Sequence, residues 1–154
     1  MKHPLTIMNR FFLHPFWRLT RGLTLGVRGV VVDSLGRVLL VRHTYYPGWH
    51  FPGGGVERDE TVYTALSREL LEEAGVVVMG EPNLHGIFAN FTNFKSDHIA
   101  VFIVETWHQD DWKKSSEIAE KKMFALDDLP ENVTPGTRRR LAEIFEYAHK
   151  AQSW

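Results

Sequence analysis

Short runs of valine, isoleucine and leucine alternate with polar or glycine-containing turns over much of the chain. Residues 24–33 are rich in valine, and residues 38–42 have the same character after the turn at residues 34–36. β-Branched runs bounded by turn residues are typical of strands. These two segments therefore predict a β-hairpin.

The rest of the pattern predicts further strands and two helices around a mixed or antiparallel sheet. Apolar residues at steps of three and four predict a helix over 60–74, with Asp59 or Glu60 as its cap and Gly75 as its end. A terminal helix is expected over 137–150. Strand-like segments lie at 76–78, 86–90, 98–107 and 121–126, an extended segment lies at 45–52, and a polar and aromatic loop lies at 90–97.

The length and composition favour one globular domain. The chain has 154 residues, of which 44% are hydrophobic and 24% charged, as in ordinary folded domains. We expect a single domain over residues 22–154 and an N-terminal extension, residues 1–21, that packs on it. The aromatic residues in segment 11–17 suit a homodimer interface as well as a cap on the core.

Charge and cysteine content exclude several classes of function. The absence of cysteine rules out disulfides and thiolate metal sites, and it fits a cytoplasmic protein. No apolar run approaches the roughly 20 residues needed to span a bilayer. The net charge of -1 gives no overall attraction for nucleic acid, so the arginines at 138–140 are read as a solvated helix start and a nucleic-acid partner is disfavoured.

Acidic residues lie where the predicted helix 60–74 should be buried. Glu69 and Glu73 continue the stripe begun by apolar residues at 62, 65 and 66, and Glu72 lies beside them. Clustered carboxylates are costly to bury unless a cation compensates them. Because oxygen ligands favour hard ions, we expect Mg²⁺, with Mn²⁺ as a second choice, together with substrate phosphates.

Three consecutive glycines come just before this helix. The carbonyl groups of Gly53, Gly54 and Gly55 could complete a metal shell, and their lack of side chains would allow a phosphate chain to approach closely. Loop and helix are therefore expected to form one site.

The spacing of these residues resembles the Nudix box, Gly-x5-Glu-x7-Arg-Glu-U-x-Glu-Glu-x-Gly-U, where U is a bulky aliphatic residue. Residues 54–76 match it at every fixed position. Segments 49–53 and 125–130 also look like sequences that surround Nudix domains. The resemblance implies an α/β/α sandwich with a mixed sheet, classed as α/β or α+β.

The resemblance also implies a metal-dependent pyrophosphatase. Such a hydrolase cleaves a nucleoside diphosphate linked to another moiety, by attack of water on phosphorus while Mg²⁺ offsets charge. Its substrate would be a small nucleotide-type molecule, and no membrane partner is implied.

Residue roles follow from the resemblance by position. Glu72 and Glu73 look like metal ligands, Glu69 like a further ligand or the catalytic base, and the Gly53 carbonyl like a backbone ligand. Arg68 is similar to the arginine that orients the glutamates, and Glu60 to a supporting acid. Gly54 and Gly55 are expected at the substrate.

Several alternatives stay open at this point. Because some Nudix enzymes take the base from outside the box, Glu117 and then Glu120 are candidates beside Glu69, although charged side chains are more commonly solvated. The aromatic residues Tyr46, Trp49, Phe91 and Phe94 could stack on a base, but such residues more commonly pack in a core.

The activity itself has a competing hypothesis. A non-catalytic sensor of a nucleotide conjugate is the main alternative, and the intact set of glutamates argues against it. Isopentenyl diphosphate isomerase is set aside because its catalytic cysteine has no counterpart here. Signatures for ADP-ribose, dinucleoside polyphosphates, coenzyme A and NADH are missing. ADP-ribose and dinucleoside polyphosphates are thereby unsupported but not excluded, and nucleoside triphosphates, nucleotide sugars and capped or triphosphorylated RNA stay open.

Overall fold

The computed structural model describes residues 22–154, so the expectations for residues 1–21 lie outside it. The elements are β1 (Thr24–Val31), β2 (Val38–His43), β3 (Trp49–His50), α3 (Val62–Ala74), β4 (Val76–Val78), β5 (Asn83–Ala89), β6 (Asp97–Val104), β7 (Trp107–Gln109), β8 (Ile118–Phe124) and α4 (Pro135–Phe145). In this part of the chain, no helix combines the length and the apolar character needed to cross a membrane.

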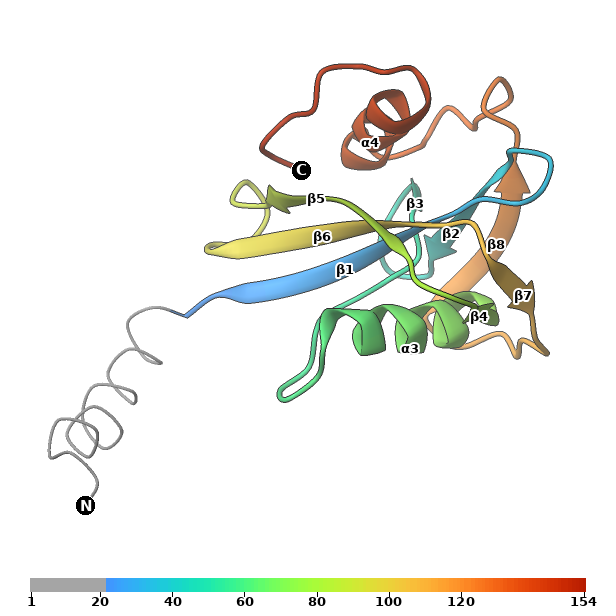
Figure 1. Ribbon diagram of the computed structural model, residues 1–154, viewed down its shortest axis with the longest axis horizontal. Helices are drawn as coiled ribbons and strands as arrows, with labels where there is room; N and C mark the ends of the chain where they lie inside the picture. The colour runs from blue at the N-terminus through green and yellow to red at the C-terminus, as the bar shows by residue number, and fades with distance from the viewer. Residues whose placement is uncertain (1–21) are drawn as a thin grey trace, which may run out of the picture.

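The strands lie between the two helices. Figure 1 shows α3 on one face of the strand layer and α4 on the other, which is the predicted α/β/α sandwich. One sheet has the order β1-β6-β5, with β1 parallel to β6 and β5 antiparallel to it. A second sheet, β3-β2-β8, and the pair β4-β7 are antiparallel. The prediction of a mixed sheet is therefore confirmed.

Each helix covers its own hydrophobic core. Leu66 and Leu70 of α3 pack with Val27 of β1 in one cluster, and all three are fully buried. On the other face, Leu141 of α4 joins a cluster with Val30 of the same strand. Strand β1 is thus buried on both sides, which explains its continuous valine-rich sequence.

The predicted β-hairpin is wrong. A tight turn does join the strands, since the Asp33 N–H donates to the Arg37 carbonyl at 3.0 Å, but pairing between them stops at a single bridge from Val32 to Val38. Strand β1 then continues beside β6, and β2 beside β8. The two strands belong to different sheets, and local sequence contains no signal for their distant partners.

The first helix ends as predicted but starts later. Gly75 adopts a left-handed conformation with φ of 64° and caps the helix. The N-terminal cap is Thr61, whose hydroxyl accepts from the Thr64 N–H at 3.1 Å, instead of Asp59 or Glu60. The Glu60 carboxylate instead accepts hydrogen bonds from Arg68.

The terminal helix is shorter than predicted. It ends at Phe145 instead of residue 150, and Tyr147 has a left-handed φ of 55°. The chain then runs along strand β5, where the Trp154 N–H donates to the Ala89 carbonyl at 2.9 Å. Residues 152–154 therefore pair with the edge of the sheet instead of extending the helix.

Most of the other predicted strands are present, but their ends differ from the prediction. The predicted strand over 98–107 is two strands, β6 and β7, with a break after Val104. The segment 86–90 belongs to β5, which starts at Asn83, and 121–126 belongs to β8, which starts at Ile118. The extended segment 45–52 contains the two-residue strand β3.

Helix α3 packs directly on β1 at a glycine. A Cβ atom added to Gly29 would lie 2.8 Å from one terminal methyl of Leu70 and 3.3 Å from a methyl of Leu66. The segment that follows β3 runs antiparallel along the same strand, since the Gly29 N–H donates to the Pro52 carbonyl at 2.9 Å. Strand β1 therefore holds both halves of the Nudix box in place.

Replacing this glycine should test the packing. We expect Gly29→Val to lower the free energy of unfolding by about 1–3 kcal/mol, because added methyl groups would force α3 away from β1. Urea titration measures this change. Gly22→Val is the matched control, since a Cβ at Gly22 meets no atom of the described residues within 4 Å; equal effects of the two substitutions would contradict the packing argument.

Candidate functional site

The glycine loop passes close to its neighbours at Gly53 and Gly54, whereas a Cβ on Gly55 would meet no described atom within 4 Å. Gly53 has a φ of 139°, and a Cβ there would lie 2.1 Å from the Val27 carbonyl oxygen. A Cβ on Gly54 would lie 2.4 Å from Oε1 of Glu69. The loop backbone thus lies directly against the acidic face of α3, as the sequence predicted.

The three carbonyl groups of the loop differ in their partners. The Gly54 carbonyl accepts from the Val27 N–H at 2.8 Å, and the Gly55 carbonyl accepts from Nη2 of Arg68 at 3.1 Å. Within residues 22–154, no hydrogen bond reaches the Gly53 carbonyl. Of the three, that carbonyl has both lone pairs available for a ligand.

Glu73 is the most deeply buried of the box acids. It is 9% exposed, and its Oε2 accepts from the Gly53 N–H at 2.8 Å. Its Oε1 lies 3.7 Å from Nε2 of His43. Burial raises the pKa of Glu73 to about 7, and the charges of Glu69 and Glu117 add to this, while the Gly53 hydrogen bond and Arg28 oppose it. The carboxylate is held in place but is short of positive charge.

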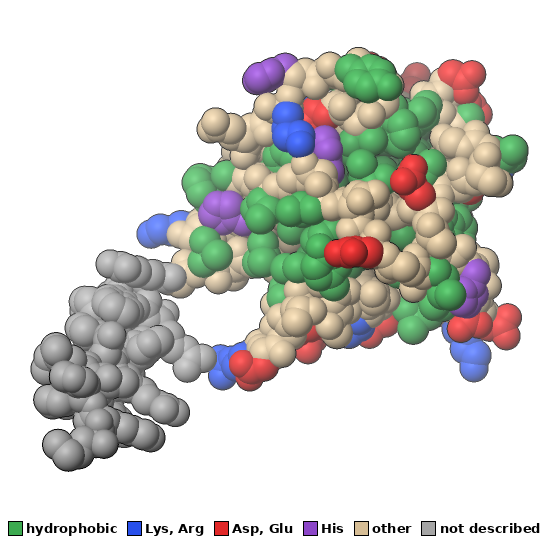
Figure 2. Space-filling view, in the orientation of Figure 1, with side chains coloured by type: hydrophobic (Ala, Val, Ile, Leu, Met, Phe, Trp, Pro, Cys, Tyr) green, Lys and Arg blue, Asp and Glu red, His purple; other side chains and the backbone are tan. Residues whose placement is uncertain are grey.

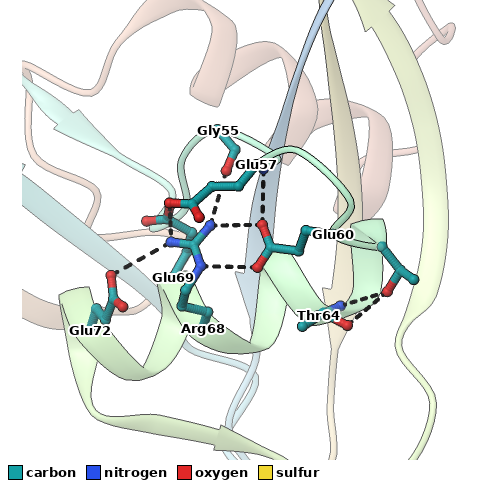
Figure 3. Close-up of polar contacts among 8 residues, drawn as sticks. Gly55, Glu57, Glu60, Thr64, Arg68, Glu69 and Glu72 are labelled. Carbon is teal, nitrogen blue, oxygen red and sulfur yellow. Dashed lines mark hydrogen bonds and ion pairs between the residues drawn. The ribbon is translucent and has the colours of Figure 1, made fainter.

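Arg68 joins the loop to the helix (Figure 3). Its Nε and Nη2 donate to the two oxygens of Glu60, each at 3.0 Å. Its Nη1 donates to Oε1 of Glu69 at 2.7 Å and lies 3.6 Å from Oε2 of Glu72. The hydrogen bonds from Arg68 lower the pKa of Glu60, and the Glu60 and Glu69 carboxylates raise that of Arg68. One guanidinium therefore fixes two acids and the Gly55 carbonyl relative to each other.

The predicted metal ligands differ in exposure. The side chain of Glu72 is 60% exposed, whereas those of Glu69 and Glu73 are 14% and 11% exposed. In the described part of the chain, no three acidic or histidine side chains converge closely enough to enclose a metal unaided.

This donor set still fits Mg²⁺. Magnesium commonly takes one or two carboxylates and keeps water or phosphate oxygens in its remaining positions. A buried carboxylate with a raised pKa, next to a carbonyl without a partner, offers two oxygen ligands and lacks a compensating cation.

The two candidate bases outside the box occupy different environments. The chain at Glu117 lies beside the end of β2, because its carbonyl accepts from the Thr44 N–H at 2.8 Å, and its charge acts on Glu73 and Tyr45. Among the described residues, no hydrogen bond reaches the exposed Glu117 carboxylate. Glu120 instead pairs with Arg42 on the sheet surface at 3.0 Å.

The aromatic candidates separate into core and surface residues. Trp49 is 7% exposed and packs edge-on against Phe124, with ring centroids 4.8 Å apart. Tyr46, Phe91 and Phe94 are 51%, 60% and 66% exposed. Of these four candidates, Phe94 lines a cavity beside the glycine loop.

That cavity has a volume of about 670 Å³, within the range of small-molecule sites. Its wall includes Gly54 and Gly55 from the loop, Asn90 and Asp97 from the ends of β5 and β6, and Arg28 from β1. The sequence analysis missed Arg28, although a single arginine within a valine-rich strand was a usable signal. It also missed His43, which borders Glu73.

Comparison with known proteins identifies the family. The model of the NUDIX domain matches residues 22–144. A MutT-like protein of Streptomyces ambofaciens is 41% identical over 69 residues, which cover 45% of this chain and 44% of that protein. Diphosphoinositol polyphosphate phosphohydrolase 2 of Rattus norvegicus is 40% identical over 94 residues, or 59% of this chain and 51% of that protein.

Fold and family agree. The matches span about half the length of these two curated relatives. A crystal structure of the MutT NUDIX hydrolase from Burkholderia pseudomallei is 27% identical, with a TM-score of 0.68, and the match covers 79% of this chain and 97% of that one. The chain belongs to the NUDIX domain family.

Proposed function

We propose that the protein is a Mg²⁺-dependent hydrolase that cleaves a diphosphate linkage in a nucleoside diphosphate linked to another moiety. The observation that carries the proposal is the buried Glu73 carboxylate, held by the Gly53 N–H at 2.8 Å in a loop whose next two glycines line a cavity large enough for an organic group. Family membership and relatives that are named as phosphohydrolases support it.

Glu73 and the Gly53 carbonyl are proposed as the inner metal ligands. Glu69 and the exposed Glu72 would approach from the open side, where Arg68 already restrains both side chains. When bound, the cation would neutralise phosphate charge and help to activate water. Arg68 and Glu60 support these ligands by fixing the loop against the helix.

Glu117 is our preferred general base, with Glu69 as the other candidate. The Glu69 carboxylate already accepts a hydrogen bond from Arg68 at 2.7 Å, so it is less free to contact an attacking water. Glu117 is exposed, and it lies close enough for its charge to act on Glu73. It could therefore accept a proton from water near the linkage. Glu120 is less suited because Arg42 holds it on the surface.

The substrate should be a small nucleotide-type molecule. Figure 2 shows charged side chains of both signs scattered over the visible face of the described residues, without a continuous basic patch that could follow a nucleic-acid backbone. Nucleoside triphosphates and nucleotide sugars are therefore the first candidates, and triphosphorylated RNA is tested beside them.

Turnover on a substrate panel tests the proposal. We expect Mg²⁺-dependent release of a monophosphate or diphosphate from at least one nucleoside triphosphate, nucleotide sugar or 5′-triphosphorylated RNA, and no release with EDTA. Glu73→Gln should lower kcat at least about 100-fold, since metal ligation supplies several kcal/mol in the transition state. Glu81→Gln, at an exposed acid outside the site, should leave kcat unchanged. Bound ligand without turnover in the wild type would favour the sensor.

The stability of the metal-free protein should depend on the charge of Glu73. Its folded-state pKa of about 7 exceeds the ordinary 4.5, so it stabilises the fold below about pH 4.5, and this contribution is lost as the pH rises through 7. Since one pH unit of difference corresponds to about 1.4 kcal/mol, the loss is roughly 3 kcal/mol.

Urea titrations at pH 5 and pH 8 measure this loss. Without metal, the wild type should lose more stability than Glu73→Gln over that range, and Mg²⁺ should stabilise the wild type more at pH 8. Identical pH profiles for the two proteins would show that ionisation of the buried Glu73 carboxylate does not lower the stability of the fold.

A further inference from the structure

Arg28 contains a buried nitrogen without a partner. Its Nη1 is inaccessible to solvent, yet within residues 22–154 it makes no hydrogen bond. An unpaired buried donor of a charged group is expensive, and native structures rarely retain one without a use for it. The fold therefore bears a cost at Arg28 that its own contacts do not offset.

Arg68 in the site and Arg140 in the core make contacts that Arg28 lacks. Arg68 donates to two carboxylates and a carbonyl. Arg140 is fully buried, but its Nη2 donates to Glu143 at 2.6 Å and its guanidinium lies 3.8 Å from the Phe88 ring centroid. Arg140 Nε is also buried without a partner, but the guanidinium groups of Arg68 and Arg140 both pair with carboxylates. Among the described residues, no hydrogen bond or ion pair reaches the Arg28 guanidinium.

Arg28 lies between the cavity and the acids. It lines the cavity together with Gly54 and Gly55. Its positive charge also lowers the pKa of Glu73 and so opposes the effect of burial. Arg28 is thus a cavity-wall residue whose charge also reaches the carboxylates.

The cavity wall contains two cations, and only one of them also acts on the acids. Among the described residues, Arg28 lines the cavity and its charge acts on Glu73, whereas Arg68 pairs with the acids but does not line the cavity. The other cation in the cavity wall, Lys95, is on the exposed loop between β5 and β6.

We propose that Arg28 is an anion-binding residue, which holds the phosphate next to the organic group of the substrate while that group lies in the cavity. This proposal rests on the proposed function and adds the orientation in which the substrate would bind. The cleaved linkage would lie toward Glu73, and the organic group toward Phe94 and Asp97. Both Asp97 oxygens already accept hydrogen bonds, from Thr24 at 2.6 Å and Asn90 at 2.7 Å, so this end of the cavity is preformed.

Binding of diphosphate analogues separates this role from turnover. The probes are methylene diphosphonate and α,β-methylene-ADP, neither of which can be hydrolysed at the bridged position, measured by calorimetry with Mg²⁺ and with EDTA. Arg28→Met should weaken both at least about tenfold, since a hydrogen bond to a charged group contributes that much. Arg28→Lys should bind the probes with an affinity between those of the wild type and Arg28→Met. Arg37→Met is the matched control, because Arg37 pairs with Asp33 in the β1–β2 turn.

Thermal unfolding excludes a structural role. Without ligand at pH 5, where Glu73 is mostly protonated and the Arg28 charge no longer stabilises it, Arg28→Met should be at least as stable as the wild type, because the substitution removes an unpaired buried donor. Unchanged probe binding by Arg28→Met, no probe binding by the wild type, or a marked loss of stability in that variant at pH 5 would each overturn the proposal.

The two proposals can fail separately. Arg28-dependent binding without turnover of any panel member would support the anion site and overturn the hydrolase. Turnover by the wild type with an unchanged KM in Arg28→Met would support the hydrolase and overturn the role of Arg28.

Discussion

The burial of one carboxylate is the constraint on which the site depends. Glu73 is 9% exposed, and its carboxylate accepts a hydrogen bond from the Gly53 N–H at 2.8 Å. This bond joins the acidic side chain of α3 directly to the backbone of the glycine loop. The ionised carboxylate is costly there without a cation, as its raised pKa indicates. The carbonyl of the same glycine accepts no hydrogen bond from residues 22–154.

The rest of the fold keeps these two elements together. Strand β1 packs α3 against its Gly29 and hydrogen-bonds the loop segment on one edge. Arg68 then fixes the loop to the helix through Glu60 and Glu69. A shift of either element would separate the carboxylate from the carbonyl, which explains why glycines and a charged network occur at fixed spacing. Arg28, on the same strand, places a positive charge where the cavity meets the acids.

The sequence predicted the local features of this arrangement better than the long-range ones. Box spacing, the helix end at Gly75 and the acidic face of α3 depend on neighbours within a few turns, and they could be read directly. The partner of β1 could not, because pairing with β6 joins residues more than 70 positions apart. The sequence did not reveal Arg28 and His43 as site residues for the same reason, because each lies at the site only through segments that are distant in the chain. The early end of α4 depends on β5 accepting residues 152–154 at its edge.

A crystal structure with Mn²⁺ and α,β-methylene-ADP, recorded with anomalous scattering, tests the central claim most directly. We predict an anomalous peak at about 2.0–2.2 Å from a Glu73 carboxylate oxygen and from the Gly53 carbonyl oxygen. A well-ordered ligand with no metal peak at Glu73, or a metal held by other residues, would contradict the account.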